Sequence, residues 1–457
     1  MSELAPVDPS GSWPVPAARG PVAGLLRLPG SKSITNRALV LAALSRGPSA
    51  ITGPLVARDT MLMVGALRAL GCRIDDPVLP DSPITDAAGT VPTWHTHPGR
   101  PAGPAAAVDV GNAGTVLRFV PPIAALTDAE VTFTGDTRIS QRPVGELLAA
   151  LRRLGAVIDD DGTGAVPFVV HGTGKLPGGA VTIDASASSQ LVSGLLLAGS
   201  RFEQGVEVRH EGAPVPSLPH IEMTIRMLAA CGADVSADPV TAGAPGSVTR
   251  RWRVRPGSLS LGEVRIEPDL SNALPFLAAA IVTGGEVTIA DWPIAGLQPA
   301  DQILELLTRM GATVRQAPGG LAVAGEGRIQ GIQADLSAVG ELTPVLTALA
   351  ALASSPSEFT GIGHLRRHES DRLAALATEI GKLGGDVTES SDGLRVTPRP
   401  LRGRGVVFDS HDDHRLVMAA AVLGLVLPGL RVADAETAGK TFPGFAEFWT
   451  RNLRLAT

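Results

Sequence analysis

Residues 67–74, LRALGCRI, end an amphipathic helical pattern at Gly71 and pass directly into a short strand-like segment. The same arrangement returns at Gly155, Gly232, Gly311 and Gly384, at intervals of 84, 77, 79 and 73 residues. A glycine directly after a helix favours the left-handed backbone with which many helices end. The interval is too long for a solenoid repeat and divides the chain into about six units. We therefore expect a multi-unit α/β or α+β fold with helices buried against sheets.

A second pattern places small polar residues directly before strongly apolar helical stretches. It occurs at 29–44, 111–120, 186–198, 268–281 and 410–423, and each begins with Ser, Asn or Asp where an N-cap belongs. Because the apolar runs are almost unbroken, these helices should be buried on most faces. Ordinary capping explains any one of these starts. Five of them, several with Arg or Lys within one turn, favour anion binding at helix N-termini.

Length and composition bound the class of protein. The 457 residues predict two domains. With 44% hydrophobic residues and a net charge of −6, a disordered chain is excluded and a generally basic nucleic-acid binder is disfavoured. Two cysteines in unrelated contexts argue against a disulfide framework or a cysteine zinc site. The sequence contains neither an apolar run of membrane-spanning length nor a signal-peptide pattern at 1–20, so a cytoplasmic location is expected.

The segment 28–39, LPGSKSITNRAL, has the chemistry of a phosphate grip. Gly30 permits close approach of a ligand, Ser31 and Ser33 offer hydroxyls, and Lys32 offers a compact charge. Arg37 follows Ser33 at the i to i+4 spacing that brings side chains together on a helix. The spacing of a Walker A loop is absent.

Further motifs of this kind follow along the chain. They are GNAGT at 111–115, QRP at 141–143, SSQ at 188–190, ESDR at 369–372, DDHR at 412–415 and KTFP at 440–443. With LPGSKSITNRAL, and in this order, they resemble the 5-enolpyruvylshikimate-3-phosphate synthase family of the enolpyruvyl transferase superfamily. The resemblance runs from about Leu28 to Phe445.

The resemblance implies a fold and a domain division. The fold is α/β (α+β), with two similar domains of three βαβαββ units each, in an enolpyruvyl transferase-like inside-out barrel. Residues 28–262 would form the first domain, on the shikimate-phosphate side. Residues 1–27 and 263–457 would form the second, discontinuous domain, with the active site in the interdomain cleft. Six units agree with the interval between the glycines.

The implied reaction transfers the carboxyvinyl group of phosphoenolpyruvate to the 5-hydroxyl of shikimate 3-phosphate, and phosphate leaves. The resemblance implies no metal or organic cofactor, no nucleic-acid or membrane partner, and a monomer. The two substrates bring roughly four or more negative charges, so an acidic chain must carry a locally basic island. Because Gly114 leaves room for a ligand of the size of phosphoenolpyruvate, inhibition by glyphosate is also expected.

Residue by residue, the resemblance assigns substrate contacts. Shikimate 3-phosphate falls on Lys32, Ser33, Arg37, Ser188, Ser189, Gln190 and Ser217. Phosphoenolpyruvate falls on Lys32, Gly114, Arg142, Gln190, Arg372, Arg415 and Lys440. Glu341 and His368 are also placed among the substrate-binding residues.

The reaction needs an acid and a base. Glu369 matches the family's proton donor, and Glu341, in GELTP, falls where the family usually has aspartate and is interpreted as the base. Lys32 is expected to stabilise the phosphate and the bridging oxygen as charge shifts. The sequence departs from the family's pattern at His368, His364 and His220, where Lys, Asn and Tyr are usual.

Three alternatives stay open at this point. The sister enzyme that uses UDP-N-acetylglucosamine normally carries a reactive loop cysteine, whereas Cys72 and Cys231 lie at helix-to-strand junctions that favour burial. A metal-dependent hydrolase could use His364, His368 and Glu369, or the HDDH segment 411–414. A catalytically inactive relative is disfavoured by the intact Lys32, Glu369 and Arg415.

Overall fold

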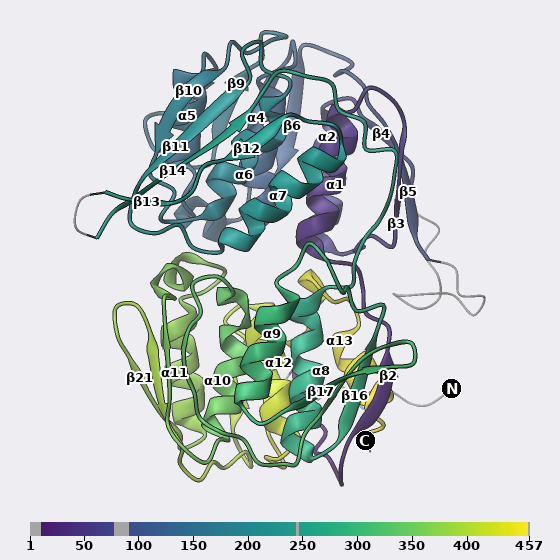
Figure 1. Cartoon of the computed structure of the whole chain (residues 1–457), viewed down its shortest axis with the longest axis vertical. Coiled ribbons are helices and arrows are strands. Elements are labelled where there is room, and N and C mark those ends of the chain that lie inside the picture. The colour runs from purple at the N-terminus through teal and green to yellow at the C-terminus, as the bar shows by residue number, and fades with distance from the viewer. Residues whose placement is uncertain (1–10, 77–90, 244–245, 456–457) are drawn as a thin grey trace. The chain divides into compact units, whose positions relative to one another are not determined.

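The computed structural model describes residues 11–76, 91–243 and 246–455 and divides into two compact units (Figure 1). One unit is residues 30–266, and the other combines residues 1–29 with 267–457. These boundaries fall two and four residues after the expected ones at 27 and 262. The second difference has a cause in the strand pairing, since β15 (Glu263–Arg265) pairs with a strand of the 30–266 unit.

The strands of the described residues form six sheets, three in each unit. In the 30–266 unit, the first sheet has the spatial order β15–β3 (Ser49–Thr52)–β5 (Thr93–His97)–β4 (Arg73–Ile74). The second sheet has the order β6 (Ala105–Asp109)–β7 (Glu130–Thr134)–β9 (Phe168–His171)–β8 (Val157–Asp159). The third has the order β10 (Gly179–Ile183)–β11 (Val206–Gly212)–β14 (Val248–Val254)–β12 (Val235–Ala237), and β13 (Thr241–Ala242) also pairs with β14. In the other unit, the first sheet has the spatial order β2 (Ala23–Leu26)–β16 (Glu286–Ala290)–β18 (Gly320–Ala324)–β17 (Thr313–Ala317). The second sheet has the order β19 (Gln333–Asp335)–β20 (Ser357–Thr360)–β22 (Leu394–Thr397)–β21 (Asp386–Glu389). The third has the order β23 (Val407–Phe408)–β24 (Arg431–Ala433)–β1 (Ser12–Pro14).

All six sheets follow one path. The first two strands of each order are parallel, and the remaining pairs are antiparallel. Four of the parallel pairs, β6–β7, β10–β11, β19–β20 and β23–β24, are consecutive strands with a helix between them, as parallel connections usually require. The sixth sheet is shorter, and β1 supplies its antiparallel strand from the N-terminal segment. The predicted two-domain fold of βαβαββ units is thereby confirmed.

Each unit takes the first strand of its first sheet from a distant part of the chain. β2 directly precedes the first helix of the 30–266 unit, yet it pairs in parallel with β16 of the other unit. β15 directly precedes the first helix after residue 267, yet it pairs in parallel with β3. The chain therefore passes between the units twice, after residues 29 and 266.

The helices occupy the crossover positions between these strands. In the 30–266 unit they are α1 (Lys32–Leu44), α2 (Arg58–Ala69), α3 (Gly114–Phe119), α4 (Pro121–Ala124), α5 (Gly145–Arg153), α6 (Ser189–Gly199) and α7 (Leu218–Ala230), with a 3-10 turn η1 (Thr137–Gln141). In the other unit they are α8 (Leu270–Thr283), α9 (Ala300–Arg309), α10 (Thr343–Ala351), α11 (Arg372–Lys382), α12 (His414–Gly424) and α13 (Phe445–Asn452), with 3-10 turns η2 (Gly340–Leu342), η3 (Gly363–Arg367) and η4 (Ala435–Lys440).

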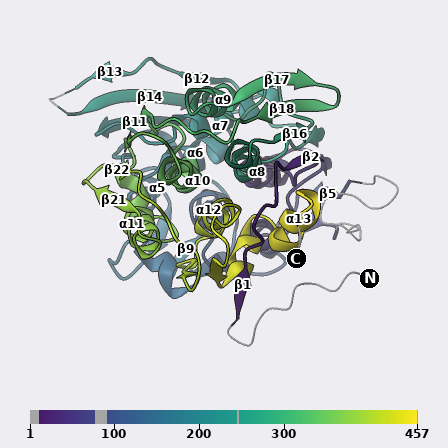
Figure 2. The same ribbon diagram turned by 90° about the horizontal axis from the view of Figure 1, so that it is seen from below.

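Three almost entirely buried helices pack on one another in the middle of each unit. They are α1, α3 and α6 in one unit and α8, α10 and α12 in the other. Figure 1 shows α8, α10 and α12 side by side, and Figure 2, from below, shows the three helices end-on in a triangle. Their apolar faces form the core, as the unbroken apolar runs predicted.

The glycine pattern of the sequence is confirmed at all five positions. Each glycine follows α2, α5, α7, α9 or α11 with a positive φ; the glycines are Gly71, Gly155, Gly232, Gly311 and Gly384. Side-chain capping is confirmed for α6, α8 and α12, where Ser188, Asp269 and Asp413 accept a backbone N–H of the first turn. It is wrong for α3, whose N-cap is Ala113, because the helix starts one residue later than an N-cap at Asn112 would require.

Candidate functional site

Lys32 and Arg37 both come from α1, and both lie largely inside the 30–266 unit. Lys32 is the first residue of the helix, and its Nζ lies 3.3 Å from Oδ2 of Asp59 in the first turn of α2. Arg37, one turn further on, is 1% exposed. The two cations of the predicted phosphate grip are therefore partly and fully withdrawn from solvent.

Arg37 is a buried cation that donates only to neutral groups in the described part of the chain. Its Nε donates to Thr224 Oγ1 at 2.7 Å, and its Nη atoms donate to Ser193 and to the carbonyl oxygens of Ser33 and His220. Its guanidinium also lies 5.1 Å from the centroid of the Phe119 ring. Burial lowers the pKa of Arg37 to about 9, because desolvation penalises the charge. The side chain is still charged at neutral pH, so a bound anion would offset that penalty.

Gly114, Arg142 and Gln190 are drawn together around Arg118, which the sequence analysis did not single out. Arg118 is 2% exposed and donates from Nη1 to Gln190 Oε1 at 2.9 Å and to the Gly114 carbonyl oxygen at 3.3 Å. Arg142 Nη1 donates to the Asn112 carbonyl oxygen at 3.0 Å. Two guanidinium groups thus flank the start of α3.

Gly114 lets these two arginines pack closely against the start of α3. A Cβ at this position would lie 2.6 Å from Nη2 of Arg142 and 2.7 Å from Nη1 of Arg118. Both distances are shorter than van der Waals contact, so a side chain here would displace a guanidinium. Gly114 was expected to leave room for a ligand, and its missing side chain also makes room for two cationic side chains.

The remaining predicted residues of this unit lie at helix starts. Ser188 caps α6, and its hydroxyl accepts the backbone N–H of Gln190 at 3.3 Å. Ser189 is the first residue of α6 and is buried. Ser217 is the N-cap of α7 and has a left-handed backbone with φ of 52°. Helix starts favour anions because their first N–H groups have no partner within the helix.

In the 267–457 unit, Glu369 lies between two cations. Its Oε2 accepts Arg372 Nη2 at 3.1 Å, and its Oε1 accepts Lys440 Nζ at 3.3 Å. Glu369 is 7% exposed, and Lys440 is 9% exposed. Two sequence motifs 71 residues apart, ESDR and KTFP, thus meet at one carboxylate.

Lys440 is held in place by an aromatic cluster. Phe442, two residues further on, packs its ring 5.9 Å from that of Phe276 on α8 and 5.7 Å from that of Phe445. The carbonyl oxygen of Thr441 accepts the side-chain amide of Asn272 at 3.0 Å. The residues after Lys440 therefore anchor it to the core of the unit.

Asp413 ties the ESDR and DDHR motifs together. It is fully buried and accepts Arg372 Nε at 2.8 Å, Arg372 Nη2 at 3.2 Å and the Ser370 hydroxyl at 3.1 Å. It also caps α12 by accepting the N–H of Arg415 at 2.9 Å. Burial alone would lower the pKa of Arg372, but the charges of Asp413 and Glu369 raise it above its ordinary value. Asp413 was predicted only as part of a motif, without this role.

Arg415 resembles Arg37 more than it resembles Arg372. Its Nη2 donates to Ser271 Oγ at 2.9 Å, and its Nη1 lies 3.5 Å from Asn272 Oδ1. Burial lowers the pKa of Arg415, and the charge of Asp269, which forms no ion pair with it in the described part of the chain, offsets only part of that effect. Within the residues that the structure describes, this guanidinium has no carboxylate within ion-pair distance.

Glu341, His364 and His368 lie at one end of the same unit. Glu341 belongs to η2, directly before α10, and its charge acts on His364, Arg372 and Arg415. The His364 and His368 rings lie 5.4 Å apart, and His368 Nδ1 lies 3.4 Å from Arg372 Nη1. Burial lowers the pKa of His364, against the opposing charge of Glu341.

The alternatives fare less well on this geometry. Both cysteines are buried; desolvation raises the pKa of Cys231 to about 11 and that of Cys72 above its ordinary value. Such thiols are poor nucleophiles. Among the described residues no three His, Cys, Asp or Glu side chains are grouped as metal ligands require. In the HDDH segment 411–414, His411 contacts Glu379 instead, and Asp413 binds Arg372 and caps α12.

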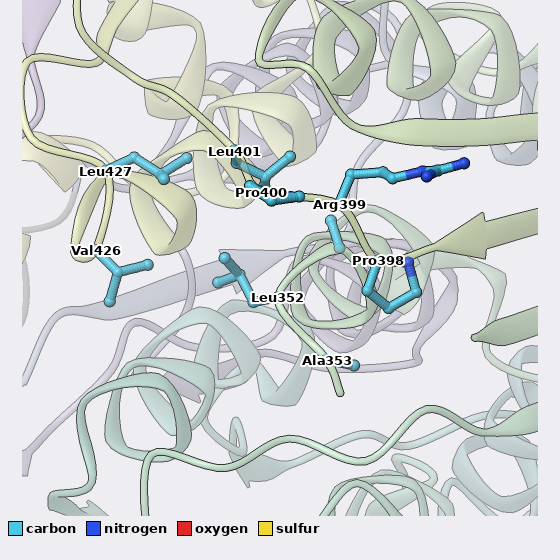
Figure 3. A pocket seen from close by; sticks show the side chains of 9 residues that line it. Leu352, Ala353, Pro398, Arg399, Pro400, Leu401, Val426 and Leu427 are labelled. Carbon is cyan, nitrogen blue, oxygen red and sulfur yellow. The ribbon is translucent and has the colours of Figure 1, made fainter. Parts of the chain in front are cut away.

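A surface hollow of about 400 Å³ lies elsewhere in the 267–457 unit (Figure 3). It is lined by the segment 351–353 after α10, by Pro398, Arg399, Pro400 and Leu401, and by Val426 and Leu427 after α12. These are the C-terminal ends of α10 and α12, and none of the predicted site residues lines the hollow.

In the described parts of the chain, no helix is both long and apolar enough to cross a bilayer.

Comparison with known proteins first gives the class. The enolpyruvyl transferase NikO from Streptomyces tendae matches with a TM-score of 0.70 over 96% of each chain, at 16% sequence identity, which shows a shared fold. An EPSP synthase from Acinetobacter baumannii matches with a TM-score of 0.74 over 96% of this chain and 98% of that one, at 26% identity. The fold is therefore that of the enolpyruvyl transferases.

The sequence comparisons then give the family. The model of the family "EPSP synthase (3-phosphoshikimate 1-carboxyvinyltransferase)" matches residues 16–449. A 3-phosphoshikimate 1-carboxyvinyltransferase from Kocuria rhizophila is 49% identical over 443 residues, which cover 96% of this chain and 95% of the relative. The chain belongs to the EPSP synthase family.

Proposed function

We propose that the chain is a 3-phosphoshikimate 1-carboxyvinyltransferase, which transfers the enolpyruvyl group of phosphoenolpyruvate to the 5-hydroxyl of shikimate 3-phosphate. The products are 5-enolpyruvylshikimate 3-phosphate and phosphate. The family assignment and the 49% identical relative support this reaction over transfer to UDP-N-acetylglucosamine. The buried thiols of Cys72 and Cys231 point the same way.

One observation carries the assignment of the site to anionic substrates. Each unit buries a guanidinium, Arg37 in one and Arg415 in the other, that donates to neutral groups and has a pKa lowered by desolvation. A buried cation without a counter-charge is costly, and a phosphate or carboxylate ligand supplies the missing charge.

The 30–266 unit is assigned to shikimate 3-phosphate. Its phosphate would meet the Ser188 and Ser189 start of α6 and the amide of Gln190, while Lys32, Ser33, Arg37 and Ser217 surround the rest of the molecule. Arg118 orients Gln190, because it donates to Oε1 and leaves the amide N–H groups as the donors available to an anion.

Phosphoenolpyruvate is assigned to cations of both units. In the 30–266 unit, Lys32 and Arg142, beside Gly114, would meet its phosphate, and Gln190 is assigned to the same ligand. In the other unit, Arg372, Arg415 and Lys440 would meet its carboxylate and phosphate, and His368 adjoins Arg372. The proposal requires both units to act on the same pair of substrates during turnover.

Glu369 and Glu341 divide the proton transfers. Glu369 donates a proton to the methylene carbon of phosphoenolpyruvate, which makes the neighbouring carbon electrophilic. The 5-hydroxyl attacks that carbon and loses its proton to Glu341. The tetrahedral intermediate then returns a methyl proton to the Glu369 carboxylate, and the electron pair of that C–H bond restores the double bond as phosphate leaves. Lys32 and the nearby guanidinium groups stabilise the charge on the departing phosphate.

The test is phosphate release with both substrates present. The wild type should release phosphate, and Glu369→Gln should lower kcat by about 10²–10⁴-fold, as expected for loss of a general acid. Lys32→Ala should lower the rate as well. Glu305→Gln, on the exposed side of α9, is the matched control and should leave the rate unchanged. A wild type that releases no phosphate, or full rates in both site variants, would overturn the proposal.

Three further expectations belong to the proposal. Replacing shikimate 3-phosphate by UDP-N-acetylglucosamine should abolish phosphate release. Glyphosate should compete with phosphoenolpyruvate, and unaffected kinetics at millimolar inhibitor would contradict this. We also propose that the chain acts in the cytoplasm as a monomer.

A further inference from the structure

The turn that precedes α12 has an unusual backbone. His411 and Asp412 both have left-handed φ values, 50° and 56°. Residues other than glycine keep such values only where their surroundings hold them. The next residue, Asp413, caps α12 and binds Arg372. A strained turn therefore leads directly into the residue that fixes a proposed substrate-binding cation.

A carboxylate on α11 holds this turn. Glu379 is fully buried, and its Oε1 lies 2.8 Å from His411 Nε2. Its Oε2 accepts the backbone N–H of Asp409 at 2.9 Å. Lys382, one turn along α11, places Nζ 2.8 Å from both oxygens and balances the charge. One carboxylate thus holds the turn at two points, Asp409 and His411.

The path from Glu379 to the site is continuous. The His411 backbone N–H donates to Asp409 Oδ1 at 2.7 Å, and the Asp413 N–H donates to the Ser410 carbonyl oxygen at 2.9 Å. Asp413 then holds two nitrogens of Arg372 and the backbone N–H of Arg415. His411 reaches these guanidiniums through the turn, whereas Glu379 also shares α11 with Arg372.

We propose that Glu379 and His411 are positioning residues for phosphoenolpyruvate. Through the turn 409–413 they fix Asp413, and Asp413 fixes the guanidinium of Arg372 and the start of α12 that carries Arg415. The inference rests on the proposed function, because it takes Arg372 and Arg415 as ligands of phosphoenolpyruvate. It explains why the HDDH segment carries a histidine at its first position without making that histidine a metal ligand.

The experiment compares kcat and both KM values in His411→Ala. This variant leaves Glu379 bound to Lys382 and to the Asp409 N–H, so the buried charge keeps its partners. The KM for phosphoenolpyruvate should rise about tenfold, since small displacements of binding groups have effects of at least this size. The KM for shikimate 3-phosphate should change less than twofold. A merely structural role would lower kcat through loss of folded enzyme and leave both KM values unchanged.

Two further variants and a control complete the test. His411→Gln, which can place an amide N–H near Glu379, should recover most of the KM for phosphoenolpyruvate. Glu379→Gln keeps the shape of the side chain and should shift the same constant, which covers the case in which His411→Ala does not fold. The control is His171→Ala, which breaks an exposed pair with Glu130 at 3.3 Å in the other unit and should change no constant.

The outcomes separate the two ideas. An active wild type with an unchanged KM for phosphoenolpyruvate in His411→Ala and Glu379→Gln overturns this inference and leaves the proposed function intact. An equal rise in both KM values, or no recovery in His411→Gln, also overturns it. A wild type that releases no phosphate overturns the proposed function and this inference with it.

Discussion

Two buried arginines, Arg37 in one unit and Arg372 in the other, are held by different kinds of partner. In the 30–266 unit, Arg37 donates to a threonine, a serine and two backbone carbonyls. In the 267–457 unit, Arg372 is held by the carboxylates of Asp413 and Glu369, and Lys440 also reaches Glu369. Burial lowers the pKa of Arg37, whereas for Arg372 the neighbouring carboxylates outweigh burial and raise it.

This difference separates holding an anion from moving a proton. A guanidinium on neutral acceptors has unbalanced charge and gains most from an anionic ligand. A guanidinium already paired with carboxylates gains less, but it fixes those carboxylates in one geometry. The first arrangement suits recognition of shikimate 3-phosphate, and the second suits a unit that supplies the acid Glu369.

The largest expected effect separates the two arginines by stability. Arg372→Met leaves the buried carboxylates of Asp413 and Glu369 without their main partner, which costs about 3–5 kcal/mol in the free energy of unfolding. Urea denaturation of the variant and of the wild type measures the loss. A loss below that of an ordinary surface substitution would break the comparison.

Arg37→Met should behave in the opposite way. Exchanging an uncompensated buried cation for an apolar side chain of similar length should change the unfolding free energy by less than about 1 kcal/mol. The affinity for shikimate 3-phosphate should fall by about 10- to 100-fold, because a charge-assisted contact is lost. Calorimetric titration measures the affinity, and denaturation measures the stability. Strong destabilisation with unchanged affinity would show that Arg37 is a structural residue.

A smaller effect is expected at Gly114. In Gly114→Ala the new Cβ meets the guanidinium ends of Arg142 and Arg118, which can move because they are the flexible parts of their side chains. The KM for phosphoenolpyruvate should rise about tenfold, equivalent to about 1.4 kcal/mol. Thermal unfolding should be nearly unchanged. A marked fall in thermal stability with an unchanged KM would contradict this account.

The smallest effect concerns pH. Burial lowers the pKa of His364 in the folded chain, against the charge of Glu341, so the unfolded chain takes up this proton more readily. Stability should therefore fall as the pH drops through about 6.5, the ordinary value for histidine. His364→Asn removes this titration, so the wild type should lose more stability than the variant between about pH 7.5 and pH 5.5. Parallel losses in the two proteins would show that His364 does not contribute.

Local patterns in the sequence predicted what depends on neighbouring residues. A helix that ends at Gly71 requires a left-handed backbone there, and an apolar run after Ser188 requires a buried helix, so both were predictable. α10 was missed because its start, GELTP, lacks the cluster of small polar residues that marks the other buried helices.

Contacts between distant segments were less accessible. That Arg118 orients Gln190, or that Asp413 holds Arg372, depends on which helix starts adjoin one another across 72 and 41 residues. The cation at Arg118 was visible in GNAGTVLR as an arginine one turn into a buried helix, and that signal could have identified it. The pairing of β15 with β3 has no counterpart in hydrophobic periodicity.

That pairing has a consequence for the growing polypeptide on the ribosome. Residues 49–52 emerge early, yet their parallel neighbour, 263–265, is made more than 200 residues later. Until then one edge of the first sheet lacks its partner strand and exposes backbone groups that could pair with other chains. Ala23–Leu26, although synthesised even earlier, also waits for Glu286–Ala290. The first sheets of the two units are therefore both complete only after translation has passed residue 266, where the chain passes between the units for the second time.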